Sequence, residues 1–232
     1  MHRHFSTRKA GLAGAAAAAL LAACGGGSGS AGGAVDIVIP QLSAAQAAAF
    51  AGDCADLSAR IATLANTSVT AVNKIAAGTL KVAGQDVPEH CQVTGSMYPR
   101  TGIDGKPYAI GFEIRLPKNW NGRFYHQGNG GVDGTVVTGL GGLGGGPLTG
   151  ALFQGFAVLS SDAGHSGATS DFGVDPQARL DYGYQAVAKL TPMAKSVIQS
   201  AYGKQPDRSY FGGCSNGGRH AMITATRLPK DY

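Results

Sequence analysis

A serine between glycines carries the strongest chemical signal in this sequence. Ser215 is the centre of residues 213–217, Gly-Cys-Ser-Asn-Gly, which have the pattern Gly-x-Ser-x-Gly. An aromatic run suited to a buried strand, 209–211, precedes it, and a run suited to a helix, 220–226, follows it. A sharp strand-to-helix turn would strain the central backbone and expose the serine hydroxyl above a sheet, as in a nucleophile elbow. We therefore predict that Ser215 is a nucleophile; the alternative is a glycine-rich turn that contains an incidental serine.

Acyl transfer by a serine also needs hydrogen-bond donors for the developing oxyanion. The backbone N–H of Asn216 lies at the predicted start of a helix, where the helix dipole favours negative charge. A second donor is expected from the loop 128–131, Gly-Asn-Gly-Gly, because glycine lets a backbone N–H approach a substrate closely. We assign this second role to Gly130 or Gly131. The alternative is a flexible connection without a chemical role.

The general base that Ser215 requires is not found in this sequence. In α/β-hydrolases an Asp or Glu, and then a His, follow the serine along the chain. His220 follows it by only five residues on the same predicted helix and cannot reach back to the hydroxyl, so we expect it to lie near the surface or to pack on the sheet. Asp162 and His165 precede the serine, and we expect Asp162 to hydrogen-bond backbone groups instead. Arg219 is expected to pair with a carboxylate beneath the turn.

The N-terminus has the pattern of a bacterial export signal. A basic segment is followed by the apolar stretch 10–21, which is too short to span a bilayer as a stop-transfer helix. Leu-Ala-Ala-Cys then resembles a lipobox, in which Cys24 becomes the lipidated first residue. We divide the chain into a lipoprotein-type signal peptide (1–24), a Gly/Ser-rich tether (25–34) and one domain (35–232). The expected location is the periplasm or outer membrane, or the exterior if a plain signal peptide is cut instead.

The charge of the chain gives no sign of a nucleic-acid partner. The formal net charge of +5 includes three basic residues of the predicted signal, and the remainder has 16 basic against 14 acidic residues. No basic stripe with interleaved aromatic residues is present. We therefore expect a small-molecule partner, and membrane contact only through the lipid anchor.

Export favours disulfide formation. With Cys24 assigned to the anchor, three cysteines remain, and they cannot all pair within the chain. We expect Cys54 and Cys91 to form a bridge because both lie in the N-terminal region, which leaves Cys214 without a partner. No Cys-x-x-Cys motif or His–Cys cluster is present, so we expect no metal site and no cofactor in this chain.

The remaining patterns predict an α/β fold with a mostly parallel sheet, because strand and helix signals alternate. Helices are expected over 43–51, with Ser43 as the N-cap, and over 55–64, 148–154 and 176–202. Strands are expected at 91–97, 110–116, 122–126, 156–159 and 209–211, and a surface loop at 139–146. Apolar residues alternate with small or charged ones in 110–116, so this strand is expected to be half-buried. In the long helical region, Thr191 and Pro192 predict either a new helix or a kink.

Several motifs together resemble the N-terminal portion of the tannase and feruloyl esterase family, which includes the hydrolase of mono(2-hydroxyethyl) terephthalate. These motifs are Trp-Asn-Gly-Arg-Phe at 120–124, the loop 128–131, Ser-Asp-Ala-Gly-His at 161–165, the stretch 210–219 and the closing 227–232. They occur in the same order and spacing as in the family. The likeness runs from about Cys54 to the end of the sequence.

The resemblance implies an α/β-hydrolase that cleaves esters of aromatic acids, such as hydroxycinnamates or gallates, through an acyl-enzyme and a Ser-Asp-His triad. It gives Ser215 the role of nucleophile, and Asn216 with a glycine of 128–131 the role of oxyanion hole. It also implies that Cys214 pairs with a cysteine beside the catalytic histidine. Family members continue with a lid domain, which often binds calcium, before the Asp and His. We therefore interpret the chain as a hydrolase domain truncated after the nucleophile elbow, lacking the lid and inactive by itself.

Two other classes of protein remain open. The missing base and the tether would also suit a non-catalytic exported lipoprotein that uses the hydrolase half as a binding module. A serine peptidase or lipase would share the elbow but would give no reason for Cys214. The DNA beyond codon 232 discriminates between them, since a continuation with an Asp and a Cys-flanked His would indicate the esterase.

Overall fold

The structure is a computed structural model that describes residues 42–142 and 146–232. The predicted signal peptide, Cys24, the tether and residues 35–41 lie outside the described residues, as do 143–145 within the predicted surface loop. Residues 43–232 form one compact unit. Within the described ranges, no helix combines the length and apolar character needed to cross a bilayer.

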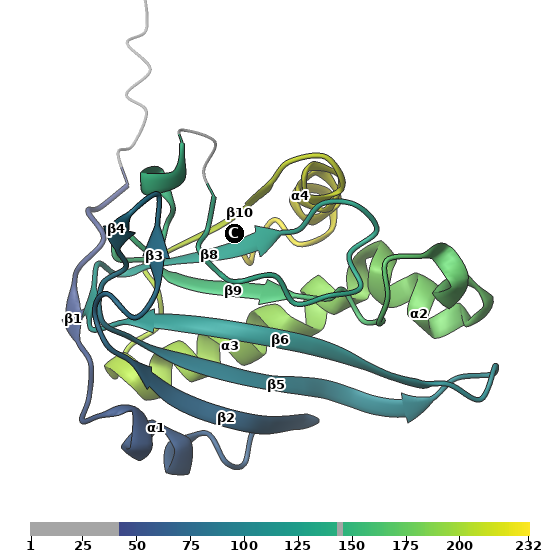
Figure 1. Ribbon diagram of the computed structural model, residues 1–232, viewed down its shortest axis with the longest axis horizontal. Helices are drawn as coiled ribbons and strands as arrows, with labels where there is room; N and C mark the ends of the chain where they lie inside the picture. Colours follow the sequence, from purple (N-terminus) through teal and green to yellow (C-terminus); the bar gives the residue numbers. More distant parts are fainter. Residues whose placement is uncertain (1–41, 143–145) are drawn as a thin grey trace, which may run out of the picture. The chain divides into compact units, whose positions relative to one another are not determined.

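A six-stranded mixed sheet forms the centre of this unit (Figure 1). In spatial order its strands are β10 (Arg208–Gly213), β8 (Arg123–Gly128), β9 (Ala157–Ser161), β6 (Pro107–Pro117), β5 (His90–Thr101) and β2 (Thr67–Ile75). The pairs β10–β8 and β8–β9 are parallel, whereas β9–β6, β6–β5 and β5–β2 are antiparallel. The prediction of a mostly parallel sheet was therefore wrong for three of its five strand pairs. The short turn between β5 and β6 is the reason, because a hairpin connection joins only antiparallel strands.

The N-terminal part of the unit differs from the predicted pair of helices. Residues 43–51 form no helix, and Ala48–Ala49 form the short strand β1, which pairs with β7 (Asn119–Trp120), so Ser43 caps no helix there. The second predicted helix is present as α1 (Cys54–Arg60), whose N-cap is Asp53. The Asp53 carboxylate accepts from the N–H of Asp56, and the Asp56 carboxylate accepts from the N–H of Asp53. This reciprocal pair is a capping box.

Two further short elements complete this region. Strands β3 (Lys81–Val82) and β4 (Gln85–Asp86) form a small hairpin. The predicted helix at 148–154 is only a 3-10 turn, η1 (Pro147–Thr149), followed by tight turns.

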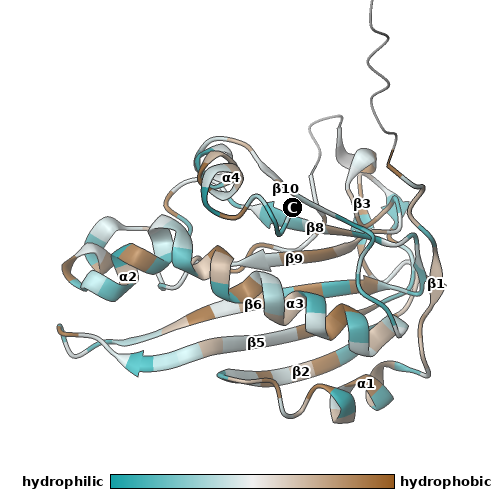
Figure 2. Ribbon diagram, turned by 180° about the vertical axis from the view of Figure 1, so that it is seen from behind, coloured by the Kyte–Doolittle hydropathy of each residue, from teal (hydrophilic) through white to brown (hydrophobic). Residues whose placement is uncertain are grey.

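The predicted long helical region is continuous and covers one face of the sheet. It consists of α2 (Pro176–Leu180), a π-helical segment η3 (Asp181–Gln185) and α3 (Ala186–Tyr202). Figure 2 shows α3 lying across the strands. Neither Thr191 nor Pro192 starts a new helix: Pro192 lies inside α3, and the buried Thr191 hydroxyl donates to the carbonyl of Val187 at 2.7 Å. Leu190 and Ile198 of α3 pack with Phe112 and Ile114 of β6 in the main core.

The second face of β6 is buried as well, although its charged residues predicted exposure. Glu113 and Arg115 form a buried ion pair, with 2.6 Å between Arg115 Nε and Glu113 Oε1. The N–H of Gly139 donates to the same carboxylate oxygen at 2.8 Å. Gly139 and Gly141 are buried, so the predicted surface loop at 139–146 covers this face where it is described.

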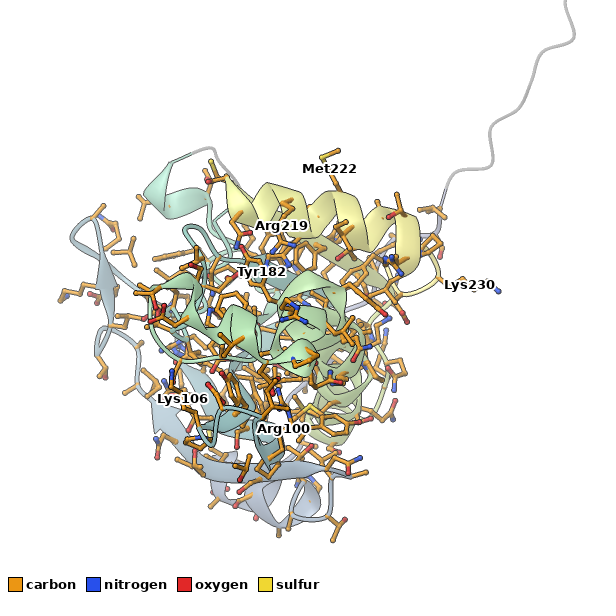
Figure 3. All side chains as sticks on the ribbon, turned by 90° about the vertical axis from the view of Figure 1, so that its right-hand side faces the viewer. Arg100, Lys106, Tyr182, Arg219, Met222 and Lys230 are labelled. Carbon is orange, nitrogen blue, oxygen red and sulfur yellow. A yellow bond between two sulfur atoms is a disulfide. The ribbon has the colours of Figure 1, made fainter. Side chains whose placement is uncertain are left out.

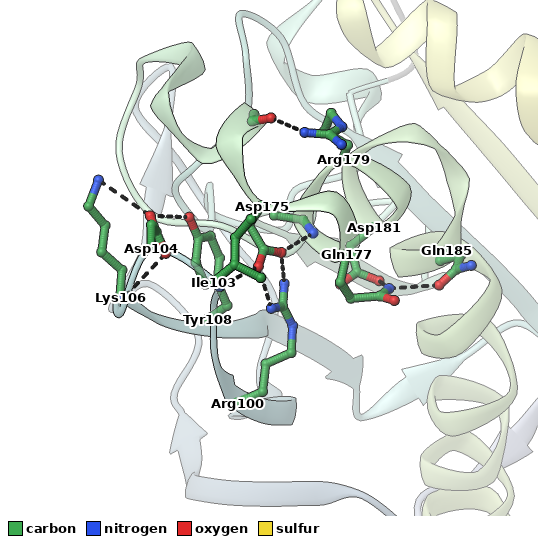
Figure 4. A network of polar contacts seen from close by, with 12 residues as sticks. Arg100, Ile103, Asp104, Lys106, Tyr108, Asp175, Gln177, Arg179, Asp181 and Gln185 are labelled. Atoms are coloured by element: carbon green, nitrogen blue, oxygen red, sulfur yellow. Dashed lines mark hydrogen bonds and ion pairs between the residues drawn. The ribbon is translucent and has the colours of Figure 1, made fainter.

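Two cross-links hold the two ends of strand β5. The expected disulfide joins Cys54 of α1 to Cys91 of β5, with 5.6 Å between the Cα atoms. At the other end of β5, Arg100 binds the buried Asp175 carboxylate with both terminal nitrogens, at 3.0 and 2.5 Å (Figure 4). Asp175 also accepts from the N–H of Ala178 and so caps α2. The hydrogen bonds from Arg100 hold the pKa of Asp175 well below its usual range.

Candidate active site

Ser215 occupies the strained turn that its sequence context predicts. β10 ends at Gly213 and α4 (Asn216–Arg227) begins directly after the serine. The backbone of Ser215 has φ 57° and ψ −122°, a region that is unfavourable for any residue with a Cβ. The residue is exposed at the tip of the turn. This is the geometry of a nucleophile elbow.

The glycines beside Ser215 make room for the neighbouring strand β8. A Cβ on Gly213 would lie 2.4 Å from the carbonyl oxygen of Gly128, and a Cβ on Gly217 would lie 2.3 Å from the same atom. Both distances are shorter than any real contact. The elbow can therefore form only if residues 213 and 217 have no side chain, and the end of β8 is held against it.

The loop after β8 is anchored on both sides of its two glycines. Before them, the Asn129 amide donates to Ser161 O at 2.8 Å and Ser160 Oγ at 3.1 Å. After them, the N–H of Gly134 donates to the carbonyl of Asp162 at 3.1 Å.

Between these anchors, Gly130 and Gly131 are exposed, and within the described residues their N–H groups donate no hydrogen bond. They therefore offer free donors on a fixed loop close to the elbow. The oxyanion role of Gly130 or Gly131 stays a prediction.

The side chain of Asn216 is held from two directions. Its Oδ1 accepts from the Tyr182 hydroxyl at 3.0 Å and from Arg219 Nε at 2.7 Å, while its Nδ2 donates to Asp133 Oδ2 at 2.6 Å. The Arg219 guanidinium lies 4.2 Å from the centre of the Tyr182 ring, and the two side chains lie together in Figure 3. The backbone N–H of Asn216 is the first of α4 and has no partner within the helix.

Among the residues that the structure describes, Arg219 pairs with no carboxylate, which corrects the prediction for this residue. Besides Asn216, it donates to the backbone carbonyls of Tyr182 and Gly183 at 3.2 and 3.4 Å. The guanidinium therefore joins α4 to the π-helical segment η3.

His220 packs in the interior, one of the two placements expected for it. Its Nε2 lies 2.9 Å from Asp133 Oδ2, and the two side chains are only 4% and 2% exposed. A hydrogen bond to the carboxylate, which only accepts, places the proton on Nε2. Arg219 Nη2, 3.1 Å from the same nitrogen, then contacts it without donating to it. No hydrogen bond joins His220 to Ser215 in the described part of the chain. His220 is thus a partner of Asp133 rather than a base for the serine.

Asp162 and His165 do not act together. Asp162 Oδ1 accepts from the N–H groups of Gly111 at 2.9 Å and Gly164 at 2.8 Å, which confirms the expected backbone role. Burial raises the pKa of Asp162 to about 7 despite these bonds. His165 is buried and stacks on Phe172, with 3.7 Å between ring centroids.

Sequence reasoning overlooked Asp133, which contacts two residues of α4. Nothing in its local sequence, Gly-Val-Asp-Gly, distinguishes it from an ordinary turn residue. Cys214 is exposed and free in the structure. Within the described residues, no group of three or more His, Cys, Asp or Glu side chains could hold a metal ion.

A parallel strand that runs through a strained serine into a helix, with a glycine loop against the turn, defines the α/β-hydrolase class. Within this class, the family model described as "Tannase and feruloyl esterase" matches residues 91–232. The chain belongs to the tannase and feruloyl esterase family.

Similar proteins include bacterial and fungal enzymes. The mono(2-hydroxyethyl) terephthalate hydrolase of Piscinibacter sakaiensis is 44% identical over 155 residues, which are 63% of this chain and 26% of that protein. Feruloyl esterase B of Aspergillus niger is 30% identical over 209 residues, 85% of this chain and 38% of that enzyme. The crystal structure of feruloyl esterase B from Aspergillus oryzae has a TM-score of 0.66 at 25% identity and covers 77% of this chain and 35% of that one.

The chain therefore spans between about a quarter and two fifths of the length of these relatives.

Proposed function

We propose that the polypeptide containing this chain hydrolyses carboxylic esters of aromatic acids through an acyl-enzyme on Ser215. The observation that carries the proposal is the strained, exposed backbone of Ser215 at the elbow, in a chain of the tannase and feruloyl esterase family. A structure stores such strain where a reactive group must be presented.

In the proposed reaction, Ser215 Oγ attacks the ester carbonyl and the alcohol leaves. The negative charge that develops on the carbonyl oxygen is stabilised by the N–H of Asn216 and by that of Gly130 or Gly131. Water then attacks the acyl-enzyme, releases the acid and restores the serine. Each of these N–H groups is free to donate, and the N-terminus of α4 adds a favourable dipole.

The proton of Ser215 needs an acceptor that the described residues do not supply. His220 is engaged with Asp133, and His165 is stacked on Phe172. We propose that the base and its carboxylate lie in a part of the protein that follows residue 232. The matched residues make up only 26% and 38% of two relatives, and the greater length of these relatives supports this proposal.

We further propose that the acyl group of the ester is aromatic. It is supported by the names of the relatives, which specify a terephthalate half-ester and feruloyl esters. The acid that the protein prefers is decided by groups that contact the acyl chain. A panel of methyl ferulate, methyl gallate and mono(2-hydroxyethyl) terephthalate would identify it.

The decisive experiment measures ester hydrolysis by the complete gene product and by its Ser215→Ala variant. We expect the substitution to lower kcat on the order of 10⁴–10⁶-fold. Ser68→Ala is the control, because Ser68 is an exposed serine on β2. The 1–232 chain alone is expected to have negligible activity. Undiminished hydrolysis by Ser215→Ala would refute the assignment.

A binding module without catalysis is the second candidate, favoured by one observation: no described histidine hydrogen-bonds Ser215. This candidate predicts that the complete gene product binds methyl ferulate, as measured by calorimetry, without turnover. Turnover that depends on Ser215 excludes it.

We also propose that the protein is exported. The Cys54–Cys91 disulfide supports this, because such bonds persist in oxidising compartments. We further propose that Cys24 is lipidated, and this proposal rests on the lipobox-like sequence alone. Mass spectrometry of the mature N-terminus tests both: a diacylglyceryl-modified Cys24 supports the anchor, and a free N-terminus near residue 24 indicates a plain signal peptide.

A further inference from the structure

One buried carboxylate connects the two segments that carry the proposed oxyanion donors. Asp133 lies in the loop after β8, and its side chain is only 2% exposed. Its Oδ2 accepts from Asn216 Nδ2 at 2.6 Å and from His220 Nε2 at 2.9 Å, and both donors belong to α4. Within the described residues, no other side-chain hydrogen bond joins the loop 129–134 to this helix.

The backbone of Asp133 is tied to the glycines of the same loop. Its N–H donates to the carbonyl of Gly130 at 3.3 Å and closes a tight turn around Gly131. Its φ of 60° is left-handed, a conformation that Asp tolerates better than most residues. A single residue thus contacts Gly130 through its backbone and Asn216 through its side chain.

This connection matters because the two donors are far apart in the chain. Asn216 and Asp133 are separated by 83 residues, so local geometry does not fix the distance between the loop and the helix. An oxyanion hole works only if its donors are held within about 0.5 Å of the productive arrangement. The Gly128–Gly217 contact sets how close the backbones approach, and the hydrogen bonds of Asn129 and Gly134 hold the loop to residues 160–162. Neither set of contacts joins Gly130 and Gly131 to α4.

The partners of Asp133 are themselves held. Asn216 also binds Tyr182 and Arg219, so its amide cannot rotate away from the carboxylate. His220 is buried on the inner side of α4. A shift of the loop would therefore break both hydrogen bonds to the Asp133 carboxylate and leave that buried group without these partners, which is costly.

We propose that Asp133 is a positioning residue that holds the Gly130–Gly131 segment and the N-terminus of α4 in register as one oxyanion hole. It touches neither substrate nor the reacting atoms. We call the hydrogen bonds of Asp133 with Gly130, Asn216 and His220 the clamp. The inference rests on the proposed function, because it predicts that the clamp affects turnover.

The test compares Asp133→Asn and Asp133→Ala in the complete gene product with methyl ferulate. Asp133→Ala is expected to lower kcat about 10- to 100-fold with KM changed less than about threefold, since losing a whole oxyanion donor costs about 10²–10³-fold. Asp133→Asn keeps the shape and one acceptor oxygen, so a smaller loss is expected.

Asp175→Ala is the matched control. It removes an equally buried carboxylate that also joins two segments, Arg100 of β5 and the start of α2. We expect it to lower the unfolding temperature at least as much as Asp133→Ala while kcat stays within about twofold. Equal kcat losses in both variants would mean that Asp133 acts only through stability, and would overturn the proposal.

A double-mutant cycle with Asn216→Ala provides a second criterion. Asn216→Ala keeps the backbone N–H but removes the amide that Asp133 binds. If the clamp acts through this contact, the kcat loss of the double variant will be clearly smaller than the product of the two single losses. Losses that multiply would contradict it. If Asp133→Ala does not fold, the cycle is run with Asp133→Asn.

A readout without turnover separates this inference from the proposed function. Amide hydrogen exchange at position 133 and at Gly134, whose N–H groups donate to the carbonyls of Gly130 and Asp162, is expected to increase in Asp133→Asn and to stay unchanged in Asp175→Ala. If Ser215→Ala retains activity, the proposed function fails, and exchange still reports whether the clamp holds the loop. If Ser215 is essential but folded Asp133 variants keep wild-type kcat, the inference alone fails.

Discussion

The Cα of Gly217 and the carbonyl of Gly128 are so close that a Cβ on Gly217 would lie 2.3 Å from the oxygen. The oxygen belongs to the backbone at the end of β8, which pairs with β10, and it cannot move aside easily. We expect Gly217→Ala to destabilise the fold by about 1–3 kcal/mol and to displace the start of α4.

Gly218→Ala is the control for this substitution, because its Cβ would have only one neighbour, at an ordinary 3.5 Å. Alanine is the better helix former, so this variant should be neutral or more stable by about 0.5–1 kcal/mol. Thermal unfolding of both variants checks the prediction. Equal stability of the two would contradict the account of the elbow.

The disulfide between Cys54 and Cys91 closes a loop of 37 residues. Constraining a loop of this length in the unfolded chain stabilises a protein by about 4 kcal/mol on the chain-entropy model. Replacing both cysteines by alanine should lower the free energy of unfolding by about 2–4 kcal/mol in denaturant titrations. Cys214→Ser should leave it unchanged, because Cys214 is exposed and free.

The buried Asp162 should make stability fall as the pH rises. Its pKa is raised from 3.8 to about 7 by burial, so between these values the folded state keeps a proton that the unfolded state releases. The free energy of unfolding therefore decreases across this window, by at most about 4 kcal/mol, and levels off above pH 7.

Asp162→Asn tests this dependence, because its oxygen can still accept from Gly111 and Gly164. The variant should gain stability over the wild type between pH 4 and pH 7 and keep that gain at pH 8. A difference that does not change with pH would show that Asp162 does not titrate as its burial implies.

Local signals predicted the elbow, and distant contacts escaped prediction. Gly-x-Ser-x-Gly between an aromatic run and a helical run placed Ser215 correctly, because the strained turn is built from adjacent residues. Asp133 could not be predicted, since its partners Asn216 and His220 lie 83 and 87 residues away. Carboxylates in loops are common, and nothing in the sequence shows which of them becomes buried.

The wrong predictions about the fold also concern segments whose structure depends on distant contacts. The alanine-rich segment 43–51 has a high helix propensity, but Ala48–Ala49 pairs with Asn119–Trp120 as a short strand and the segment forms no helix. Glu113 and Arg115 suggested a solvent-facing side of β6, whereas they neutralise each other beneath a covering loop. In both cases tertiary contacts from other parts of the chain outweighed the local pattern.

The central claim, that Ser215 is the nucleophile, is tested most directly by covalent labelling. The complete gene product is treated with a fluorophosphonate, and the modified residue is located by peptide mass spectrometry. The account predicts one adduct, on Ser215, that forms in parallel with the loss of methyl ferulate hydrolysis. Loss of hydrolysis with an adduct on another residue, or hydrolysis that persists after Ser215 is fully labelled, would contradict it.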